Sequence, residues 1–176
     1  GRGTGGRGRD YEKATYLQLG KLEIEDQIAG TEALLRDYNY LDRERVGMFG
    51  WSFGGYMSLL ALTKGTEAFT TAVAVAPVTN WRYYDTIYTE RFLRTPQENA
   101  NGYDDNSPIS HVKQFDGKLL MIHGTADDNV HFQNSVDFTS AMIEAGKQLR
   151  TFYYPNKDHA IAGGITRYHL FQMMEQ

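Results

Sequence analysis

The 176-residue sequence contains no cysteine, only four prolines and no long apolar run. The lack of cysteine excludes disulfides, a thiol nucleophile and cysteine-ligated zinc. A membrane-spanning helix needs about 18–20 consecutive apolar residues, and no stretch approaches that length. The formal net charge is −4, and there is no run of basic residues apart from a few separated arginines near the start. The sequence therefore gives no reason to expect nucleic-acid binding.

The residues that are present have the composition of one globular domain, with 41% hydrophobic and 23% charged residues. Short apolar runs predict buried strands, and segments of helical periodicity lie between them. The predicted strands are 46–49, 71–76, 118–122 and 149–154, and the predicted helices include 21–36, 56–64 and about 164–174. Residues 1–9 are predicted to be a linker, 81–94 helical or turn-rich, and 96–110 loop. This alternation predicts an α/β fold with a mainly parallel sheet flanked by helices.

Ser52 lies in the pattern Gly50-Trp51-Ser52-Phe53-Gly54, between a predicted strand and a predicted helix. In that context G-x-S-x-G is typical of a nucleophile elbow, which holds the serine in a strained turn. A Cβ at position 50 or 54 is expected to collide with the neighbouring turn. The turn would aim the amide N–H of Phe53 at a developing oxyanion. The alternative is a glycine-rich turn whose serine only caps a helix.

An aspartate of the pair Asp127-Asp128 and His159 follow the ends of later predicted strands. Functional groups of parallel sheets collect beyond the carboxyl ends of the strands, and the order Ser…Asp…His is that of the α/β-hydrolase triad. The imidazole would take the serine proton, and the carboxylate would orient the imidazole. Asp127 is favoured because it lies closer to the strand end, whereas Asp128 would serve to cap the helix near His131.

The other histidines are predicted to have no catalytic role. His123 and His131 flank the two aspartates, but the spacing matches neither a zinc site nor an EF-hand loop, so we expect no metal and no cofactor. His123 is predicted to be structural at a strand end. His111 and His169 are predicted to be surface histidines or to have their hydrogen bonds satisfied.

Trp81, Tyr84 and Tyr88 are spaced i, i+3 and i+7, which on a helix would place them on one face. Three such aromatics are more often core than pocket, but the phenol groups favour a half-exposed position because a buried hydroxyl needs a partner. A compact aromatic box would suit proline or alanine. Asn129, beside the predicted acid, would orient a bound peptide.

Three segments resemble the dipeptidyl peptidase IV branch of the prolyl oligopeptidase family of serine peptidases, and the similarity extends over essentially the whole chain. They are GWSFGGY at 50–56, YYDTIYTER at 83–91 and HGTADDNVHF at 123–132. The resemblance implies an α/β-hydrolase fold with Ser52 as nucleophile, Asp127 as acid and His159 as base. It also implies a proline-sized pocket whose residues are Val78, Trp81, Tyr84, Tyr88 and Val130, with Asn129 contacting the substrate carbonyl.

The activity that the resemblance implies is that of a serine exopeptidase, which releases N-terminal X-Pro or X-Ala dipeptides from peptide substrates through an acyl-enzyme. The alternatives are an acylaminoacyl peptidase, a prolyl oligopeptidase or an esterase on the same fold, or an inactive structural or dimerisation fragment. The resemblance further implies a homodimer formed through the hydrolase domain and a periplasmic, cell-surface or secreted location.

The chain departs from the family pattern in two respects. Ala160 follows the predicted base, where relatives usually have Gly or Ser. The family's β-propeller, its early hydrolase strands and the tyrosine that acts as second oxyanion donor have no counterpart in this sequence. Residues 1–176 are therefore expected to be the C-terminal part of a catalytic domain, with the strand at 46–49 left as an apolar edge.

Overall fold

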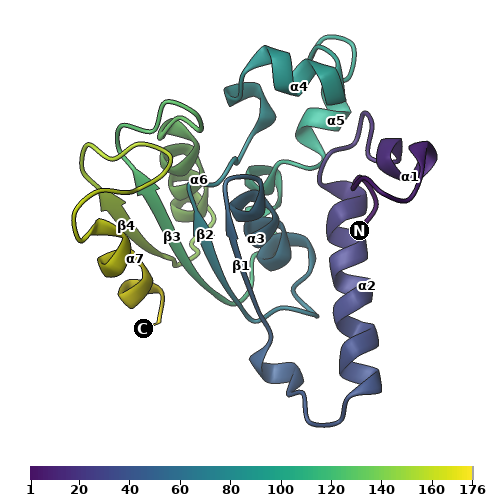
Figure 1. Cartoon of the computed structure of the whole chain (residues 1–176), viewed down its shortest axis with the longest axis horizontal. Helices are drawn as coiled ribbons and strands as arrows, with labels where there is room; N and C mark the ends of the chain where they lie inside the picture. Colours follow the sequence, from purple (N-terminus) through teal and green to yellow (C-terminus); the bar gives the residue numbers. More distant parts are fainter. Residues whose placement is uncertain (176) are drawn as a thin grey trace.

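The computed structural model describes residues 1–175 (Figure 1). The elements in chain order are α1 (Arg9–Lys13), α2 (Lys21–Asp37), the 3₁₀ helix η1 (Arg43–Arg45), β1 (Gly47–Trp51), α3 (Phe53–Lys64), β2 (Thr71–Val75), the 3₁₀ helix η2 (Trp81–Tyr83), α4 (Thr86–Leu93), α5 (Ala100–Asp104), the 3₁₀ helix η3 (Pro108–Gln114), β3 (Lys118–Gly124), α6 (Gln133–Glu144), β4 (Arg150–Tyr154) and α7 (Thr166–Met174).

The strands in the described residues form one parallel sheet in the order β1-β2-β3-β4. The register aligns Trp51 with Val75, Val75 with Ile122 and Ile122 with Phe152. The residues that follow these positions therefore leave the sheet at the same edge. This architecture confirms the predicted α/β class with a parallel sheet.

Helices cover both faces of the sheet. Ala74 and Met121 point to the face covered by α3 and α6, where they share one core with Leu59 and Phe138. The neighbouring strand residues point the other way and pack with Leu170 of α7, as the period-2 alternation of a strand requires. In Figure 1, α2 stands on the far side of α3 from the sheet.

Helix α3 is apolar on nearly all sides because it lies between the sheet and α2. Tyr56, Leu59, Leu60 and Leu62 are each 0% exposed. A helix that is hydrophobic all round belongs in the interior. The buried helix fixes the position of the turn at its N-terminus, where Ser52 lies.

The prediction of loop at 96–110 is wrong in part, because α5 and the start of η3 lie there. The backbone N–H of Gly102 donates to the side chain of Asn99, which caps α5. Residues 81–94 are also not one helix: Tyr84 is extended between η2 and α4, and Asp85 caps α4 by accepting from the N–H of Tyr88. Side-chain caps of this kind start short helices without any apolar periodicity.

The prediction of a linker at residues 1–9 is wrong, whereas the prediction that the strand at 46–49 lies at a sheet edge agrees with the described sheet. Residues 1–9 are not a free linker, because the Arg2 guanidinium binds the Asp26 carboxylate of α2 at 2.6 and 2.9 Å. β1 is an edge strand of the described sheet, and Phe49 on it is 54% exposed. On α7 it is Leu170 that is buried, whereas Tyr168 is 67% exposed. None of the helices in residues 1–175 is long and apolar enough to span a bilayer.

Candidate functional site

Ser52 stands at the turn between β1 and α3 in a strained backbone conformation, with φ 59° and ψ −116°. A non-glycine residue seldom adopts such angles, and strain of this kind collects at functional sites. The backbone holds it there: Ser52 N donates to Val75 O at 2.8 Å, and Tyr56 N donates to Ser52 O at 3.0 Å. The Ser52 side chain makes no capping hydrogen bond to α3. A cap is therefore not its role.

The two glycines of the elbow motif are not equivalent. A Cβ at Gly50 would overlap the backbone carbonyl group of Gly54, so only glycine fits there. A Cβ at Gly54 would meet nothing within 4 Å. The expectation that both positions exclude a side chain is thus wrong for Gly54, because the Cα–Cβ direction at that position points away from the neighbouring turn.

Asp127 is 5% exposed and lies beyond the end of β3, where both carboxylate oxygens accept hydrogen bonds. Oδ1 accepts from the backbone N–H groups of Asn129 at 3.0 Å and Val130 at 2.9 Å. Oδ2 lies 2.7 Å from Nδ1 of His159 and 3.2 Å from Nε2 of His123. Burial alone would raise the pKa of the Asp127 carboxyl, but the hydrogen bonds from His123 and His159 outweigh it and hold that pKa well below its usual range.

Asp128 is exposed, and α6 begins without a side-chain cap, so the predicted capping role of Asp128 is wrong. Asp127 is the aspartate that faces His159.

The loop after β4 crosses the sheet edge toward Ser52. β1 and β4 are three strand spacings apart, roughly 14 Å, yet the indole N–H of Trp51 donates to the backbone carbonyl of His159 at 2.9 Å. Arg167 fastens the same loop: its Nε donates to Ala160 O at 2.9 Å, and its guanidinium lies over the Trp51 ring. The backbone of His159 is thus bonded to the residue that directly precedes Ser52.

The hydrogen bond to Asp127 leaves the other ring nitrogen of His159 available. Within residues 1–175, Nε2 of His159 makes no hydrogen bond. An imidazole with Nδ1–H bonded to a carboxylate presents Nε2 as a base. Sequence reasoning missed the part played by Trp51, whose need for a hydrogen-bond acceptor was the available signal.

The predicted aromatic group comes together although its members are not on one helix. The Trp81 ring contacts those of Tyr84 and Tyr88, each with a centroid separation of 5.8 Å, and Tyr84 and Tyr88 are 5.3 Å apart. Val78, Trp81 and Val130 are buried in the same core, whereas the two tyrosines are half-buried. Burial raises the pKa of both tyrosine hydroxyls. The ring of Phe53 packs on Trp81 and joins this group to the elbow.

A pocket of about 520 Å³ lies beside this aromatic group. Two of the predicted substrate-binding residues line it, Tyr84 and Asn129, and the Tyr84 hydroxyl donates to Asn129 Oδ1 at 2.7 Å. Its other lining residues are Arg82, Tyr83, Asp85, Asp128 and His131. Val78, Trp81, Tyr88 and Val130 do not line it. The first, second and fourth of these side chains are buried in the core, and Tyr88 packs partly against that core.

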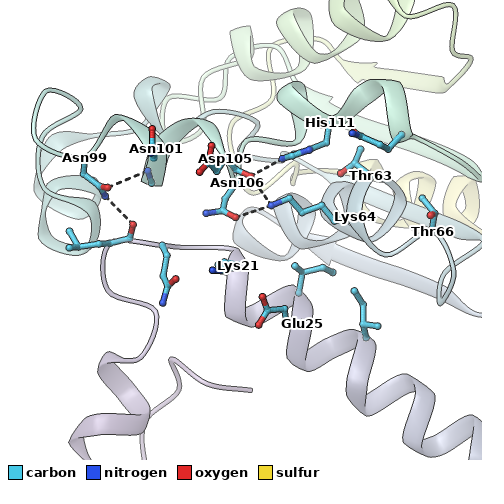
Figure 2. Close-up of a pocket in the computed structure, with 16 residues that line it drawn as sticks. Lys21, Glu25, Thr63, Lys64, Thr66, Asn99, Asn101, Asp105, Asn106 and His111 are labelled. Carbon is cyan, nitrogen blue, oxygen red and sulfur yellow. Dashed lines mark hydrogen bonds between the residues drawn. The ribbon is translucent and has the colours of Figure 1, made fainter.

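A second hollow of about 730 Å³ lies between α2, α3, α5 and η3 and shares no residue with the predicted site (Figure 2). Figure 2 shows Lys64 and His111 turned toward the backbone carbonyl of Asp105, each at 2.7 Å. Lys64 also donates to Asn106 Oδ1 at 2.9 Å. The polar groups at the centre of this hollow are thus bound to one another.

His111 and His169 have hydrogen-bond partners, as the sequence predicts. His111 contacts a backbone carbonyl, and His169 Nδ1 lies 2.7 Å from the Tyr154 hydroxyl. No three His, Asp or Glu side chains of residues 1–175 gather in a way that would hold a metal ion.

Comparison with known proteins gives consistent matches along the chain. A sequence model described as the prolyl oligopeptidase family, peptidase family S9, matches residues 1–176. Dipeptidyl peptidase 4 of Sus scrofa and prolyl endopeptidase FAP of Mus musculus are each 40% identical to this chain over 99% of its length. The chain spans 23% of the length of each of these relatives.

Solved structures agree with these matches. The crystal structure of Porphyromonas gingivalis dipeptidyl peptidase 4 superposes with a TM-score of 0.95 and 48% sequence identity, covering 99% of this chain and 25% of that protein. A putative dipeptidyl aminopeptidase IV from Bacteroides ovatus superposes with a TM-score of 0.94 and 37% identity, again over 99% of this chain and 24% of the other. The parallel sheet and its flanking helices therefore have the α/β-hydrolase fold.

Proposed function

The chain belongs to the prolyl oligopeptidase family of serine peptidases, and from that premise we propose that Ser52, Asp127 and His159 are a catalytic triad. We further propose that residues 1–176 form the C-terminal part of the catalytic domain of a protein that releases X-Pro or X-Ala dipeptides from peptide N-termini. One observation carries this proposal. The strained turn at Ser52 lies beside the loop of His159, whose Nδ1 is bound to Asp127 and whose Nε2 makes no hydrogen bond with any of the described residues.

Each residue has a defined step in this reaction. Ser52 Oγ attacks the scissile carbonyl carbon while His159 Nε2 takes its proton, and Asp127 stabilises the resulting imidazolium. The C–N bond then breaks, and His159 returns the proton to the leaving amine. Water hydrolyses the acyl-enzyme by the same route in reverse, which restores Ser52. The amide N–H of Phe53, at the first turn of α3, would donate to the oxyanion.

The aromatic group supports a preference for a small residue at the bond to be cleaved. Trp81 and Tyr88 are stacked, and Tyr84 meets both rings edge-on. Because Trp81 is buried, the half-buried rings of Tyr84 and Tyr88 would provide the apolar surface against which a flat pyrrolidine ring packs. Asn129, held by the Tyr84 hydroxyl, would donate its amide to the substrate carbonyl.

The test begins with a fluorophosphonate probe, which reacts with an activated serine. We expect the protein to be labelled at Ser52, and Ser52→Ala to lose labelling without a change in its unfolding midpoint. Labelling of the Ser52→Ala variant at an unchanged rate would refute the assignment. An unlabelled wild-type protein would favour the inactive structural module.

The relatives raise a second candidate, since one of them is named a prolyl endopeptidase at the same 40% identity. Three substrates separate the activities: a Gly-Pro amide with a free amine, its N-blocked form and a simple ester. Fastest cleavage of the free-amine substrate is expected. Faster cleavage of the blocked peptide would favour an endopeptidase or acylaminoacyl peptidase, and fastest turnover of the ester would favour an esterase.

We also propose that the protein forms a homodimer through this domain. Ile165, Tyr168 and Phe171 are 79%, 67% and 47% exposed at α7, an unusual density of large apolar side chains on a surface. Light scattering after size exclusion should give twice the chain mass, and Ile165→Asp should shift it toward the monomer. An unchanged dimer in that variant would exclude α7 as the contact.

A further inference from the structure

His123 lies near the end of β3 and is 0% exposed, with both ring nitrogens in hydrogen-bond contact. Nδ1 lies 2.7 Å from Ser135 Oγ of α6. Nε2 lies 2.8 Å from the backbone carbonyl of Val130 and 3.2 Å from Asp127 Oδ2. The ring of Phe132 meets the imidazole edge-on and covers it. The proposed mechanism gives this histidine no step.

The contacts assign a tautomer to the His123 ring. A backbone carbonyl only accepts hydrogen bonds, so Nε2 must carry the proton that faces Val130 O. The Ser135 hydroxyl can then donate to an unprotonated Nδ1. A neutral ring in this state satisfies every contact without burying an unneeded positive charge. The Nε2 proton is therefore shared between Val130 O and Asp127 Oδ2.

We propose that His123 is a positioning residue that couples the acid of the triad to Val130, in the core beneath the substrate pocket. Its Nε2–H contacts Asp127 on the same oxygen that binds His159, and it contacts Val130 in the core beneath the aromatic group. This inference rests on the proposed function, since it assigns a support to that same site.

The bonds around Asp127 form a closed set. The Val130 N–H donates to Asp127 Oδ1, and the Val130 carbonyl accepts from His123 Nε2–H. The same Nε2–H also donates to Asp127 Oδ2. Rotation of the carboxylate would break bonds on both sides of this set. A donor on Oδ2 also withdraws negative charge from the oxygen that faces His159, which limits how strongly Asp127 stabilises an imidazolium there.

The kinetic test compares His123→Leu with His123→Gln in the full-length protein, and His111→Gln serves as a control histidine outside the site. A hydrogen bond to a charged group typically corresponds to about a 10- to 100-fold change in rate, so His123→Leu should lower kcat/KM for a Gly-Pro amide by about that factor. Both a lower kcat and a higher KM are expected, because Asp127 also accepts from the backbone N–H of the pocket residue Asn129, so the acid and this residue shift together. His123→Gln should recover most of the loss, since its amide nitrogen can reach the place of Nε2.

The pH profile separates positioning from general support of the fold. With the donor on Oδ2 removed, Asp127 attracts the imidazolium of His159 more strongly, so the acid limb of kcat/KM should move to higher pH in His123→Leu. Rates are normalised to the Ser52 sites titrated with the fluorophosphonate probe. An unmoved acid limb with wild-type kcat, or a His123→Gln variant no better than His123→Leu, would overturn the proposal. If His123→Leu does not fold, Ser135→Ala decides, with a smaller loss and the same direction of shift expected.

A measurement independent of activity keeps this inference separate from the proposed function. In protein labelled with ¹⁵N-histidine, and with the His123 signals assigned by their loss in His123→Gln, Nε2 should be protonated and Nδ1 unprotonated at neutral pH. A protonated Nδ1 would overturn the positioning role even in an active enzyme. An unlabelled Ser52 would instead overturn the proposed function while leaving the tautomer result intact.

Discussion

Ser52 and the Asp127–His159 pair lie at the same edge of the sheet, but the structure holds them by different means. The nucleophile arm, residues 50–56 around the proposed nucleophile, is held by backbone hydrogen bonds and by packing: Ser52 N donates to Val75 O, Gly50 leaves no room for a Cβ, and Tyr56 is 0% exposed beneath the turn. The acid–base arm, residues 123–130 together with 156–160, is held by side-chain hydrogen bonds that converge on Asp127.

This difference predicts different sensitivities. A closely packed turn is sensitive to changes in side-chain volume, because its atoms have no free space into which to shift. The stability of a hydrogen-bonded arm depends on charge and on each donor and acceptor. It is less sensitive to small changes in side-chain volume. Substitutions that change only volume or only charge can therefore test each arm separately.

The largest effect is expected at Gly50. Gly50→Ala places a Cβ into the backbone of Gly54, so the turn must open; we expect loss of Ser52 labelling and a fall in unfolding free energy of about 3 kcal/mol or more. Gly54→Ala is the matched control, since its Cβ meets nothing within 4 Å and alanine favours the helix by up to about 1 kcal/mol. Denaturant unfolding measures both. Equal destabilisation by the two variants would show that packing does not hold this arm.

The next largest effect is expected from Asp127→Asn, which keeps the volume and removes the charge. The amide no longer fixes Nδ1–H of His159, and kcat should fall by about 10⁴-fold. Asp37→Asn, on the exposed end of α2, serves as the control. A loss below tenfold in single-turnover kinetics would contradict the role given to the carboxylate.

The two arms also differ in how much of them could be predicted from the sequence. The strand at Thr71–Val75 and the helix that follows Ser52 were predictable because both are rich in apolar residues, and the order of Ser52, Asp127 and His159 was visible directly in the sequence. The error at Gly54 arose because the direction of a Cα–Cβ bond depends on backbone angles that the motif does not specify.

The support of the acid–base arm was not predictable, for a physical reason. Trp51 and His159 are bonded across 108 positions of sequence, and no local pattern encodes such a contact. The role proposed for His123, which the sequence predicts only to be structural, could not be foreseen because it depends on contacts with Val130 and with Ser135 in a later helix. The capped helix α5 was missed for a related reason, since Asn99 and not periodicity starts it.

A smaller effect is expected at the boundary between the arms, where the Tyr84 hydroxyl binds Asn129 at 2.7 Å. Tyr84→Phe keeps the ring and loses this bond, so the Asn129 amide is no longer oriented. An exposed neutral hydrogen bond is worth about 1 kcal/mol, so KM for a Gly-Pro amide should rise by about fivefold while kcat changes little. A fall in kcat of the same size with unchanged KM would mean that Tyr84 acts on the transition state instead.

The smallest expected effect is on the pH dependence of the unfolding free energy, which has opposite signs in the two arms. In the nucleophile arm it depends on Glu23, which lies near Tyr56. Burial raises the pKa of the Glu23 carboxyl to about 7, although its Oε2 accepts from Gly20 N at 2.9 Å. In the unfolded chain this carboxyl ionises near its ordinary pKa of 4.5. The stabilisation by protonated Glu23 is thus complete below about pH 4.5 and is lost as the pH rises through about 7.

Asp127 has the opposite sign, since its pKa is lowered in the folded state and its contribution is lost only as the solution becomes acidic. Unfolding free energies measured from pH 4 to pH 8 should therefore decline between 4.5 and 7 in the wild type. The decline should flatten in Glu23→Gln, which keeps the acceptor for Gly20 N but cannot ionise, and should persist in Glu144→Gln on the exposed face of α6. A decline of unchanged slope in Glu23→Gln would show that another group titrates behind the nucleophile arm.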